Sequence, residues 1–348
     1  MITLQKARKT LEPLFPGMQI KEAVHISNKG DVYNQIFRID TSLGSLLLKQ
    51  ISDLGQKYGE ETITDAVYGA LVDQYVGQTI GYYDVDYVKV LAVDFSKKSE
   101  LKSSYILVDF VQGTSVDNID AGKDVALEGM MQFMYEVYKV FPAQDVPGPL
   151  RFPIERMLNK TICRGVSIEE LGRMIRNMQN YTENGLDFFL NDIENTSLQS
   201  RIKRRLTKIA TEFKGALVPN AFHLVHGDLK LSNLIKTDRG IQLIDWSRAH
   251  YGDIATDLAD IVVSTVSTFG TDEGQKNLDE LTIRVAPDPA ERTALIRRVS
   301  FYYYFKIFSI ARVFYEDELD TVSQVILNAG CNLSEVIALS GWLEGKHY

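Results

Sequence analysis

Three polar residues in one short stretch have the types and the spacing that phosphoryl transfer needs. Asp228 can accept the proton of a hydroxyl group, Asn233 offers a neutral amide oxygen, and Asp245 adds a carboxylate. Moving a phosphoryl group requires little covalent help but much positioning and charge neutralisation. Amide and carboxylate oxygens are hard ligands that suit Mg²⁺. The stretch therefore predicts a magnesium-dependent transfer site, with Asp228 as the base and Asn233 and Asp245 as metal ligands.

The residues between Asn233 and Asp245 have the pattern of a hairpin. Short apolar runs at 234–235 and 241–244 flank a turn-like segment, 236–240, which ends in glycine. Two apolar runs joined in this way are typical of two paired strands. We expect the hairpin to bring Asp245 back beside Asn233.

These residues resemble the signature of the aminoglycoside phosphotransferase and choline kinase group, which shares the protein-kinase-like fold. The resemblance lies in the sequence HGD at 226–228, followed by Asn233, and in IDW at 244–246. It implies that Asp228 is the catalytic-loop aspartate, that Asn233 binds metal, and that Asp245 corresponds to the aspartate of the kinase D-F-G motif.

The residues that follow extend the resemblance. Gly252-Asp253 and Asp257 fit a G-D-x-x-x-D-L-A continuation, whose aspartates are expected mainly to brace the catalytic loop and to cap a helix. His226 would be a structural member of the loop and not a base. HGD alone is an ordinary turn sequence, but the fixed order of all these parts over about thirty residues favours the family.

The resemblance implies an α+β fold with two lobes. A small amino-terminal lobe with an antiparallel sheet is expected at 1–110, where it clamps the nucleotide. A large, mainly helical lobe is expected at 111–348, with the catalytic loop and the substrate-binding helices. Helical periodicity agrees, with helices predicted at 167–178, 198–213, 295–315 and 321–339 and a loop at 270–274.

A phosphate-covering loop is expected near the amino terminus. Residues 27–34 lie between the segments AVHI at 23–26 and QIFRI at 35–39, which predicts a strand, a turn and a second strand. The turn has one glycine where the kinase loop has three. Gly30 and Asp31 are the candidates for backbone contacts to phosphate, and an ordinary surface hairpin is the alternative.

Lys49 ends the apolar run 46–48 and is the candidate for holding the α- and β-phosphates. Its acidic partner is sought in the helix that follows, in which Ile63 and Val67 share one face. Glu60 lies one turn before Ile63 and is the candidate, with Glu61 as the alternative. Two solvated glutamates at the start of a helix would give the same pattern.

Adenine recognition is expected where an apolar run reaches a glycine turn, at 105–113. Kinases of this fold bind adenine mainly through backbone groups, so Val108, Asp109 and Phe110 are the hinge candidates. A plain core strand is compatible with the same sequence.

The expected activity is transfer of the γ-phosphoryl group of ATP or GTP to a hydroxyl of a small molecule. The acceptor would be an aminoglycoside-like antibiotic or an amino alcohol or sugar metabolite. A protein kinase is one alternative, but Trp246-Ser247 replaces Phe-Gly and no Ala-Pro-Glu follows. A nucleotide-binding pseudokinase is another, although Lys49 and all three residues of the transfer site are present.

Composition and net charge narrow the classes of protein to which this chain could belong. The chain has 348 residues, 45% hydrophobic and 24% charged, as expected for a folded soluble protein. Its net charge of −8 argues against a nucleic-acid binder, and the basic run 201–208 has the spacing of a solvated helix face. No apolar run approaches the ~20 residues that span a bilayer. We expect no membrane partner and a cytoplasmic location.

The remaining features of the sequence say less about function. The two cysteines, Cys163 and Cys331, are too isolated for a zinc site and are expected to be buried packing. The aromatic residues 302–304 and the acidic segment 316–320 could attract a cationic acceptor, but solvated charges past a helix end are the preferred interpretation.

Overall fold

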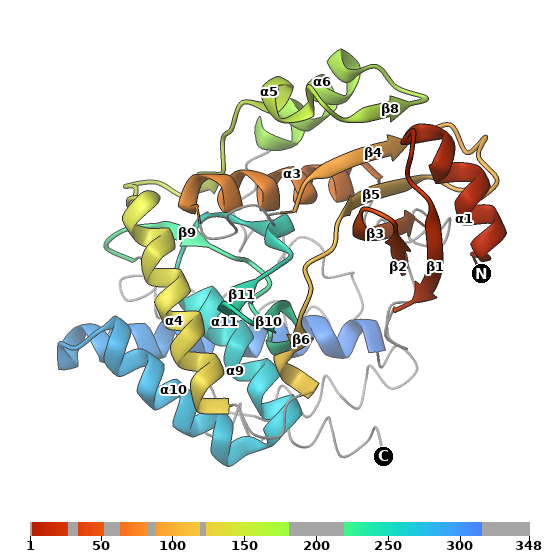
Figure 1. Ribbon diagram of the computed structural model, residues 1–348. Helices are drawn as coiled ribbons and strands as arrows, with labels where there is room; N and C mark the ends of the chain where they lie inside the picture. The colour runs from red at the N-terminus through yellow and green to blue at the C-terminus, as the bar shows by residue number, and fades with distance from the viewer. Residues whose placement is uncertain are drawn as a thin grey trace. The chain divides into compact units, whose positions relative to one another are not determined.

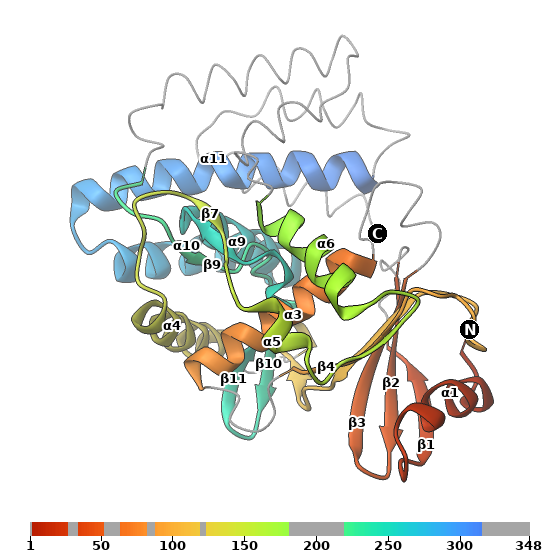
Figure 2. The ribbon, with the colours of Figure 1, turned by 90° about the horizontal axis from the view of Figure 1, so that it is seen from above.

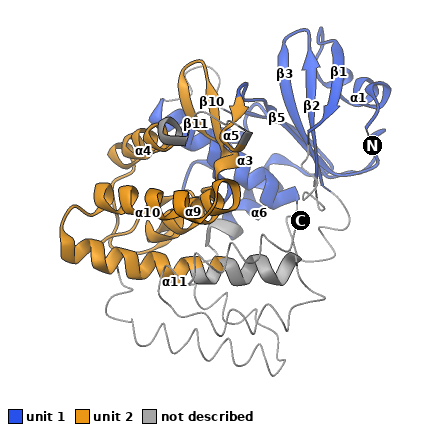
Figure 3. Cartoon of the chain, turned by 90° about the horizontal axis from the view of Figure 1, so that it is seen from below, with its two compact units in different colours: residues 1–113, 149–181, 244–248 blue, residues 114–148, 182–243, 249–348 orange. Residues whose placement is uncertain are grey.

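The computed structural model describes residues 2–26, 34–51, 63–81, 88–118, 123–180 and 219–314 (Figure 1). Contacts divide the chain into two compact units, which interleave along the sequence (Figure 3). The first unit comprises residues 1–113, 149–181 and 244–248, and the second comprises 114–148, 182–243 and 249–348. The lobe boundary expected after residue 110 stays a prediction.

The first unit is a sheet with helices. Its helices are α1 (Leu4–Leu11), α3 (Ile63–Ile80), α5 (Ile154–Leu158) and α6 (Ile168–Asn180). Its strands are β1 (Ile20–His25), β2 (Asn34–Thr41), β3 (Gly44–Ile51), β4 (Val90–Asp94), β5 (Tyr105–Asp109) and β8 (Ile162–Arg164).

These six strands form one sheet in the order β1-β2-β3-β5-β4-β8. Every neighbouring pair is antiparallel except β4 and β8, which run parallel. The expected antiparallel sheet and its strands are therefore confirmed. The parallel edge strand β8 is an addition that comes from residues far along the chain.

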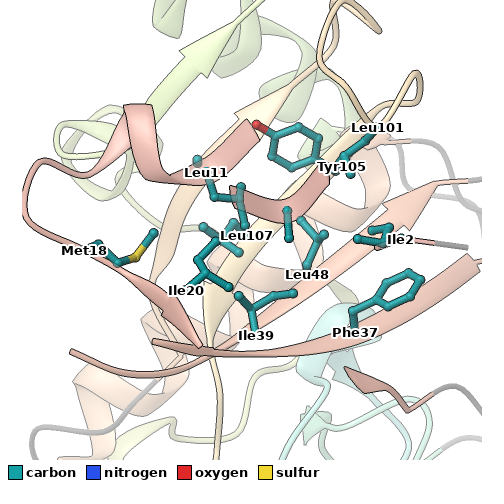
Figure 4. Packing of buried hydrophobic residues seen from close by; sticks show 12 residues of the cluster. Ile2, Leu11, Met18, Ile20, Phe37, Ile39, Leu48, Leu101, Tyr105 and Leu107 are labelled. Atoms are coloured by element: carbon teal, nitrogen blue, oxygen red, sulfur yellow. The ribbon is translucent and has the colours of Figure 1, made fainter. Parts of the chain in front are cut away.

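The core of this sheet explains where Lys49 lies. Phe37 and Ile39 on β2, Leu48 on β3 and Leu107 on β5 are buried together (Figure 4). Helix α1 packs against β1 and closes this side. Because successive side chains of a strand point to opposite faces, Lys49 lies on the other face from Leu48. Helix α3 packs against β4 and β5 in the same unit.

The second unit is mainly helical, with α4 (Lys123–Val140), α9 (Ala255–Phe269), α10 (Thr271–Val285) and α11 (Pro289–Phe314). Helices α10 and α11 both pack against α9 (Figure 2). Short strands complete it, in the orders β11-β10-β6 and β7-β12-β9. Their bounds are β6 (Thr114–Ser115), β7 (Gly148–Pro149), β9 (His223–Val225), β10 (Leu234–Thr237), β11 (Gly240–Leu243) and β12 (His250–Gly252).

Two of the predicted helices are confirmed. Helix α6 begins where Ser167 was expected to cap it, and the Glu170 N–H donates to the Ser167 hydroxyl oxygen at 3.0 Å. Helix α11 covers the segment predicted at 295–315 and begins earlier, at Pro289. The helices predicted at 198–213 and 321–339 lie outside the described residues.

The loop predicted at 270–274 is wrong beyond its first residue. Gly270 ends α9 with a φ of 91°, but Thr271 already begins α10. Acidic residues in the first turn of α10, such as Asp272, favour this helix start through the helix dipole. A Cβ on Gly274 would lie 2.2 Å from the Val266 side chain, so this glycine permits close packing on α9. Gly270 is a loop residue as predicted, whereas Gly274 was misread as one.

Among the described residues, no helix combines the length and the apolar character needed to cross a bilayer.

Candidate active site

The hairpin predicted after Asn233 is present. β10 and β11 pair antiparallel, with Leu234 opposite Leu243 and Thr237 opposite Gly240. Asn233 belongs to the second unit and Asp245 to the first. Their expected approach to each other stays a prediction.

In the second unit, the loop that carries Asp228 is held by Asp257. Its two carboxylate oxygens accept hydrogen bonds from the backbone N–H groups of His226, at 2.7 Å, and Gly227, at 2.9 Å. Burial raises the pKa of Asp257, while His226 and these two hydrogen bonds oppose the rise. The expected bracing of the loop by Asp257 is confirmed.

The side chain of His226 is buried and forms a hydrogen bond within its own loop. Its side chain is fully buried, and its Nδ1 accepts from the Asp228 N–H at 3.3 Å. A ring nitrogen that accepts a hydrogen bond carries no proton, so the proton of a neutral ring would be on Nε2. This arrangement agrees with a structural role for His226.

Asp228 and Asn233 are brought together by the loop. The Asn233 Nδ2 donates to the Asp228 carbonyl oxygen at 2.9 Å and lies 3.5 Å from Asp228 Oδ2. An amide that donates through nitrogen keeps its oxygen for a cation, which fits the metal-ligand role expected of Asn233.

Lys230 is a site residue that the sequence analysis missed. Its Nζ lies 2.8 Å from Asp228 Oδ2, in an ion pair whose side chains are 44% and 24% exposed, respectively. The available signal was its position two residues after Asp228.

Asp253 lies just before the start of α9, where an aspartate was expected to cap a helix. Its Oδ1 accepts from the N–H of Ala255, the first residue of α9, at 3.1 Å, although Ile254 is the N-cap residue of that helix. Its Oδ2 lies 2.9 Å from Nε of Arg298 on α11. Burial nevertheless raises the pKa of Asp253, against the effect of Arg298.

A third buried acid lies one turn after Asp257. The Asp260 carboxylate is 2.9 Å from Lys306 Nζ, which joins α9 to α11. The pKa of Asp260 is raised to about 7. Burial is the main cause, the charges of Asp257 and Asp228 also raise the pKa, and Lys306 opposes the rise. The charge of Asp228 therefore also acts on a buried acid of α9, outside the loop that carries Asp228.

In the first unit, Asp73 on α3 lies within electrostatic reach of Lys49. Lys49 lowers the pKa of Asp73, although burial and the Asp245 carboxylate together raise it well above its ordinary value. The expected partners, Glu60 and Glu61, lie outside the described residues. Asp73 was missed because helical spacing alone does not show which side chain turns toward a distant strand.

Asp73 also holds the segment that begins with Asp245. The Trp246 N–H donates to Asp73 Oδ1 at 2.7 Å, and the Asp245 N–H also donates to the Asp73 carboxylate. Asp245 has a φ of 65°, a left-handed conformation that is rare for residues other than glycine. A residue in this conformation persists only when its surroundings hold it, and Asp73 is part of that support.

Gly69, one turn before Asp73, allows α3 to approach this segment. A Cβ on Gly69 would lie 2.3 Å from the Ser247 Cβ and 2.9 Å from its Cα. Residues Trp246–Arg248 form a short 3-10 turn, in which Trp246 is fully buried. Gly69 and Asp73 therefore present one face of α3 to residues 245–247.

The structure describes only some of the residues that the sequence suggests for nucleotide binding. Val108 and Asp109 end β5, and the N–H groups of Asp109 and Phe110 donate to the carbonyl oxygens of Lys89, at 3.1 Å, and Ser45, at 3.4 Å. Because these two N–H groups already donate to other residues, adenine would have to bind to backbone carbonyl oxygens here or to residues after Phe110. Gly30 and Asp31 lie outside the described residues.

The structure also bears on several less specific predictions from the sequence. Cys163 is only partly buried on β8, contrary to the expected buried packing, while Cys331 lies outside the described residues. Tyr303 is fully buried, and Tyr302 is partly buried. The basic run 201–208 and the acidic segment 316–320 are also outside the described part of the chain.

Comparisons with known protein structures bear on the fold. The crystal structure of aminoglycoside phosphotransferase APH(4)-Ia has a TM-score of 0.60 and 15% identity, over 97% of this chain and 99% of that chain. A choline/ethanolamine kinase family protein from Mesorhizobium loti has a TM-score of 0.52 and 15% identity, over 97% of each chain. No curated protein sequence matches. The likenesses confirm the expected α+β kinase-like fold.

The sequence itself matches the model of one family across most of its length, from residue 27 to residue 295. This range includes Lys49, the loop around Asp228, and Asp245. It also includes Asp257, which holds that loop. The chain belongs to the phosphotransferase enzyme family.

Proposed function

We propose that this protein transfers the γ-phosphoryl group of ATP or GTP to a hydroxyl group of a small molecule. Asp228 accepts the hydroxyl proton as the acceptor oxygen bonds to the γ-phosphorus, and the bond from that phosphorus to the β-phosphate oxygen breaks. The nucleoside diphosphate leaves. Lys49 holds the phosphates.

The arrangement of Asp228 and Asn233 carries this proposal. A base and a metal-ligating amide lie side by side on one loop, linked by a 2.9 Å hydrogen bond. Asp257 holds the beginning of that loop by two further hydrogen bonds. Positioning is the main contribution a protein makes to phosphoryl transfer, and a loop fixed in this way supplies it.

We assign Mg²⁺ to Asn233 and Asp245. The ion would neutralise charge on the transferring phosphoryl group. Within the described part of the chain, no three His, Cys, Asp or Glu side chains gather as a metal cluster. Mg²⁺ that binds together with nucleotide phosphates needs only one or two protein ligands, so the two assigned residues suffice.

Structures of similar proteins support a nucleotide as the phosphoryl donor and a small molecule as the phosphoryl acceptor. Structures of APH(4)-Ia include ternary complexes with hygromycin B and either ADP or AMP-PNP. Another similar structure is the GDP complex of an aminoglycoside 2'-phosphotransferase. These proteins bind a nucleotide, and APH(4)-Ia binds a small hydroxyl compound with it. At about one residue in seven identical, they support the class of reaction and leave the acceptor open between aminoglycosides, amino alcohols and sugars.

The decisive experiment measures release of nucleoside diphosphate with Mg-ATP or Mg-GTP against aminoglycosides, amino alcohols, sugars and a protein substrate. We expect turnover with a small hydroxyl compound and its loss in Asp228→Asn, which still binds nucleotide. Asp238→Asn, in the exposed hairpin turn, is the matched control. Phosphate on the protein substrate alone would instead establish a protein kinase, and intact nucleotide binding without turnover of any substrate would indicate a pseudokinase.

A second experiment tests the metal assignment. We expect Asp245→Ala to lose the dependence of nucleotide affinity on Mg²⁺, as measured by calorimetry with and without the ion. An unchanged metal dependence would remove Asp245 from the site.

A further inference from the structure

We propose that Ser264 on α9 is a positioning residue that holds the amide of Asn233 in place to bind Mg²⁺. Its hydroxyl oxygen accepts a hydrogen bond from the Leu231 N–H at 2.9 Å. The inference rests on the proposed function, because it gives Asn233 the role of a metal ligand. It deepens that function by separating the support of the metal ligand from the support of the base.

Leu231 begins the short 3-10 turn that carries Asn233. The turn spans Leu231–Asn233, and the Asn233 N–H donates to the Lys230 carbonyl oxygen at 2.9 Å. The first N–H groups of a helical turn have no acceptor inside the turn. The side chain of Lys230, which precedes the turn, does not cap it. Leu231 is buried, so the acceptor that Ser264 supplies spares this N–H the cost of remaining unpaired.

A second serine contacts the same turn from another element. The Ser115 hydroxyl on β6 donates to the Ser232 carbonyl oxygen at 3.3 Å. Strand β6 also pairs with β10, which follows Asn233, and Ser115 lies opposite Ile235. The turn is therefore held by α9 at its first residue and by β6 at its second. Since Asn233 is itself buried, its amide has little freedom to turn away from a bound ion while these contacts persist.

Helix α9 supports the loop at two points that have different consequences. Asp257 accepts from two N–H groups just before Asp228. Ser264 accepts from an N–H two residues before Asn233. Asp257 and Ser264 are seven positions apart, which is about two helical turns, so they lie on the same face of α9. We therefore expect Asp257 to act mainly on the base and Ser264 mainly on the metal ligand.

The test measures the affinity for AMP-PNP by calorimetry with and without Mg²⁺, and it needs no acceptor. Asn233→Ala defines the effect of losing the amide ligand. In Ser264→Ala we expect the strengthening of binding by Mg²⁺ to fall by up to about tenfold, because partners that orient a metal ligand have effects of this size. Affinity without Mg²⁺ should stay. Ser264→Thr keeps the hydroxyl and should restore the wild-type dependence. Ser267→Ala, which removes an exposed hydroxyl from the same helix, is the matched control.

Asp257→Asn distinguishes a specific effect on the metal ligand from general loosening of the loop. We expect this variant to keep the Mg²⁺ dependence of nucleotide affinity. An equal loss of that dependence in Ser264→Ala and Asp257→Asn would overturn the inference. So would a wild-type dependence in Ser264→Ala, or the same loss in Ser264→Thr.

The variant at Asn233 separates this inference from the proposed function. A wild-type Mg²⁺ dependence in Asn233→Ala would show that its amide is not a metal ligand and would overturn the role of Ser264 with it. The expected calorimetric losses in a protein that phosphorylates none of the acceptors would support Ser264 as a positioning residue and reject the proposed function.

Discussion

The Trp246 N–H donates a 2.7 Å hydrogen bond to the Asp73 carboxylate, although 173 positions separate the two residues in the sequence. Asp73 thereby links helix α3 to the segment that begins with Asp245, and its pKa responds to the charge of Lys49 as well. One carboxylate thus connects two residues that we assign to the nucleotide and its metal ion.

Replacing Asp73 should weaken both folding and nucleotide binding. In Asp73→Ala the N–H of Trp246 loses its acceptor, which should lower the free energy of unfolding by roughly 1–3 kcal/mol. Asp73→Asn keeps an acceptor oxygen and should retain most stability, but it removes the carboxyl group near Lys49 and should bind Mg-ATP more weakly. Urea unfolding and calorimetry measure the two effects. Gln78→Ala, exposed near the end of the same helix, should change neither.

Gly69→Ala should separate α3 from residues 245–247. The new Cβ would overlap Ser247, and overpacking of this kind costs roughly 1–3 kcal/mol. We expect lower stability in urea and a reduced rate of transfer. Gly172→Ala on α6 is the control, because its Cβ would meet only the ends of flexible side chains, the nearest at 3.4 Å. That change should leave stability equal or slightly higher. Equal behaviour of the two variants would contradict the close approach.

Asp257→Asn should loosen the catalytic loop. An amide has one accepting oxygen, so one of the two N–H groups at His226 and Gly227 would face an NH₂ group instead. We expect turnover to fall by about 100-fold through misplacement of Asp228, with nucleotide affinity largely kept. Steady-state kinetics and calorimetry separate these effects. Glu280→Gln, exposed on α10, should match the wild type. A variant with normal turnover would show that the loop does not need this brace.

Asp260 should make stability depend on pH. Its pKa is raised to about 7 in the folded protein, so between roughly pH 4 and pH 7 the folded state holds a proton that the unfolded state has released. The free energy of unfolding should therefore fall as the pH rises through this window. The change should approach about 1.4 kcal/mol per pH unit where the two states differ by one proton.

The double variant Asp260→Asn and Lys306→Met removes the titrating group together with its ion-pair partner. Urea unfolding from pH 4 to pH 8 should show a smaller fall than in the wild type. Wild-type and variant curves that run parallel would show that Asp260 titrates normally.

Much of this protein can be predicted from its sequence because the informative patterns are local. Alternation of Phe37 and Ile39 along β2 indicates a strand with one buried face, whatever that face meets. The hairpin after Asn233 is likewise a short-range structure, set by two apolar runs and a turn. Asp228 and Asn233 lie five residues apart, so the loop that carries both is visible as a motif.

The tertiary structure decided which distant residues support that motif. Asp73 reaches Trp246 and the field of Lys49 only because α3 packs in one particular rotation, which Gly69 permits. Ser264 supports Leu231 for a similar reason, through the packing of α9. Sequence spacing indicates which face of a helix is apolar, but a partner far along the chain is chosen by the packing of whole elements. For that reason the sequence alone determined the fold family and the residues proposed for the chemistry, while the structure determined what holds them in place.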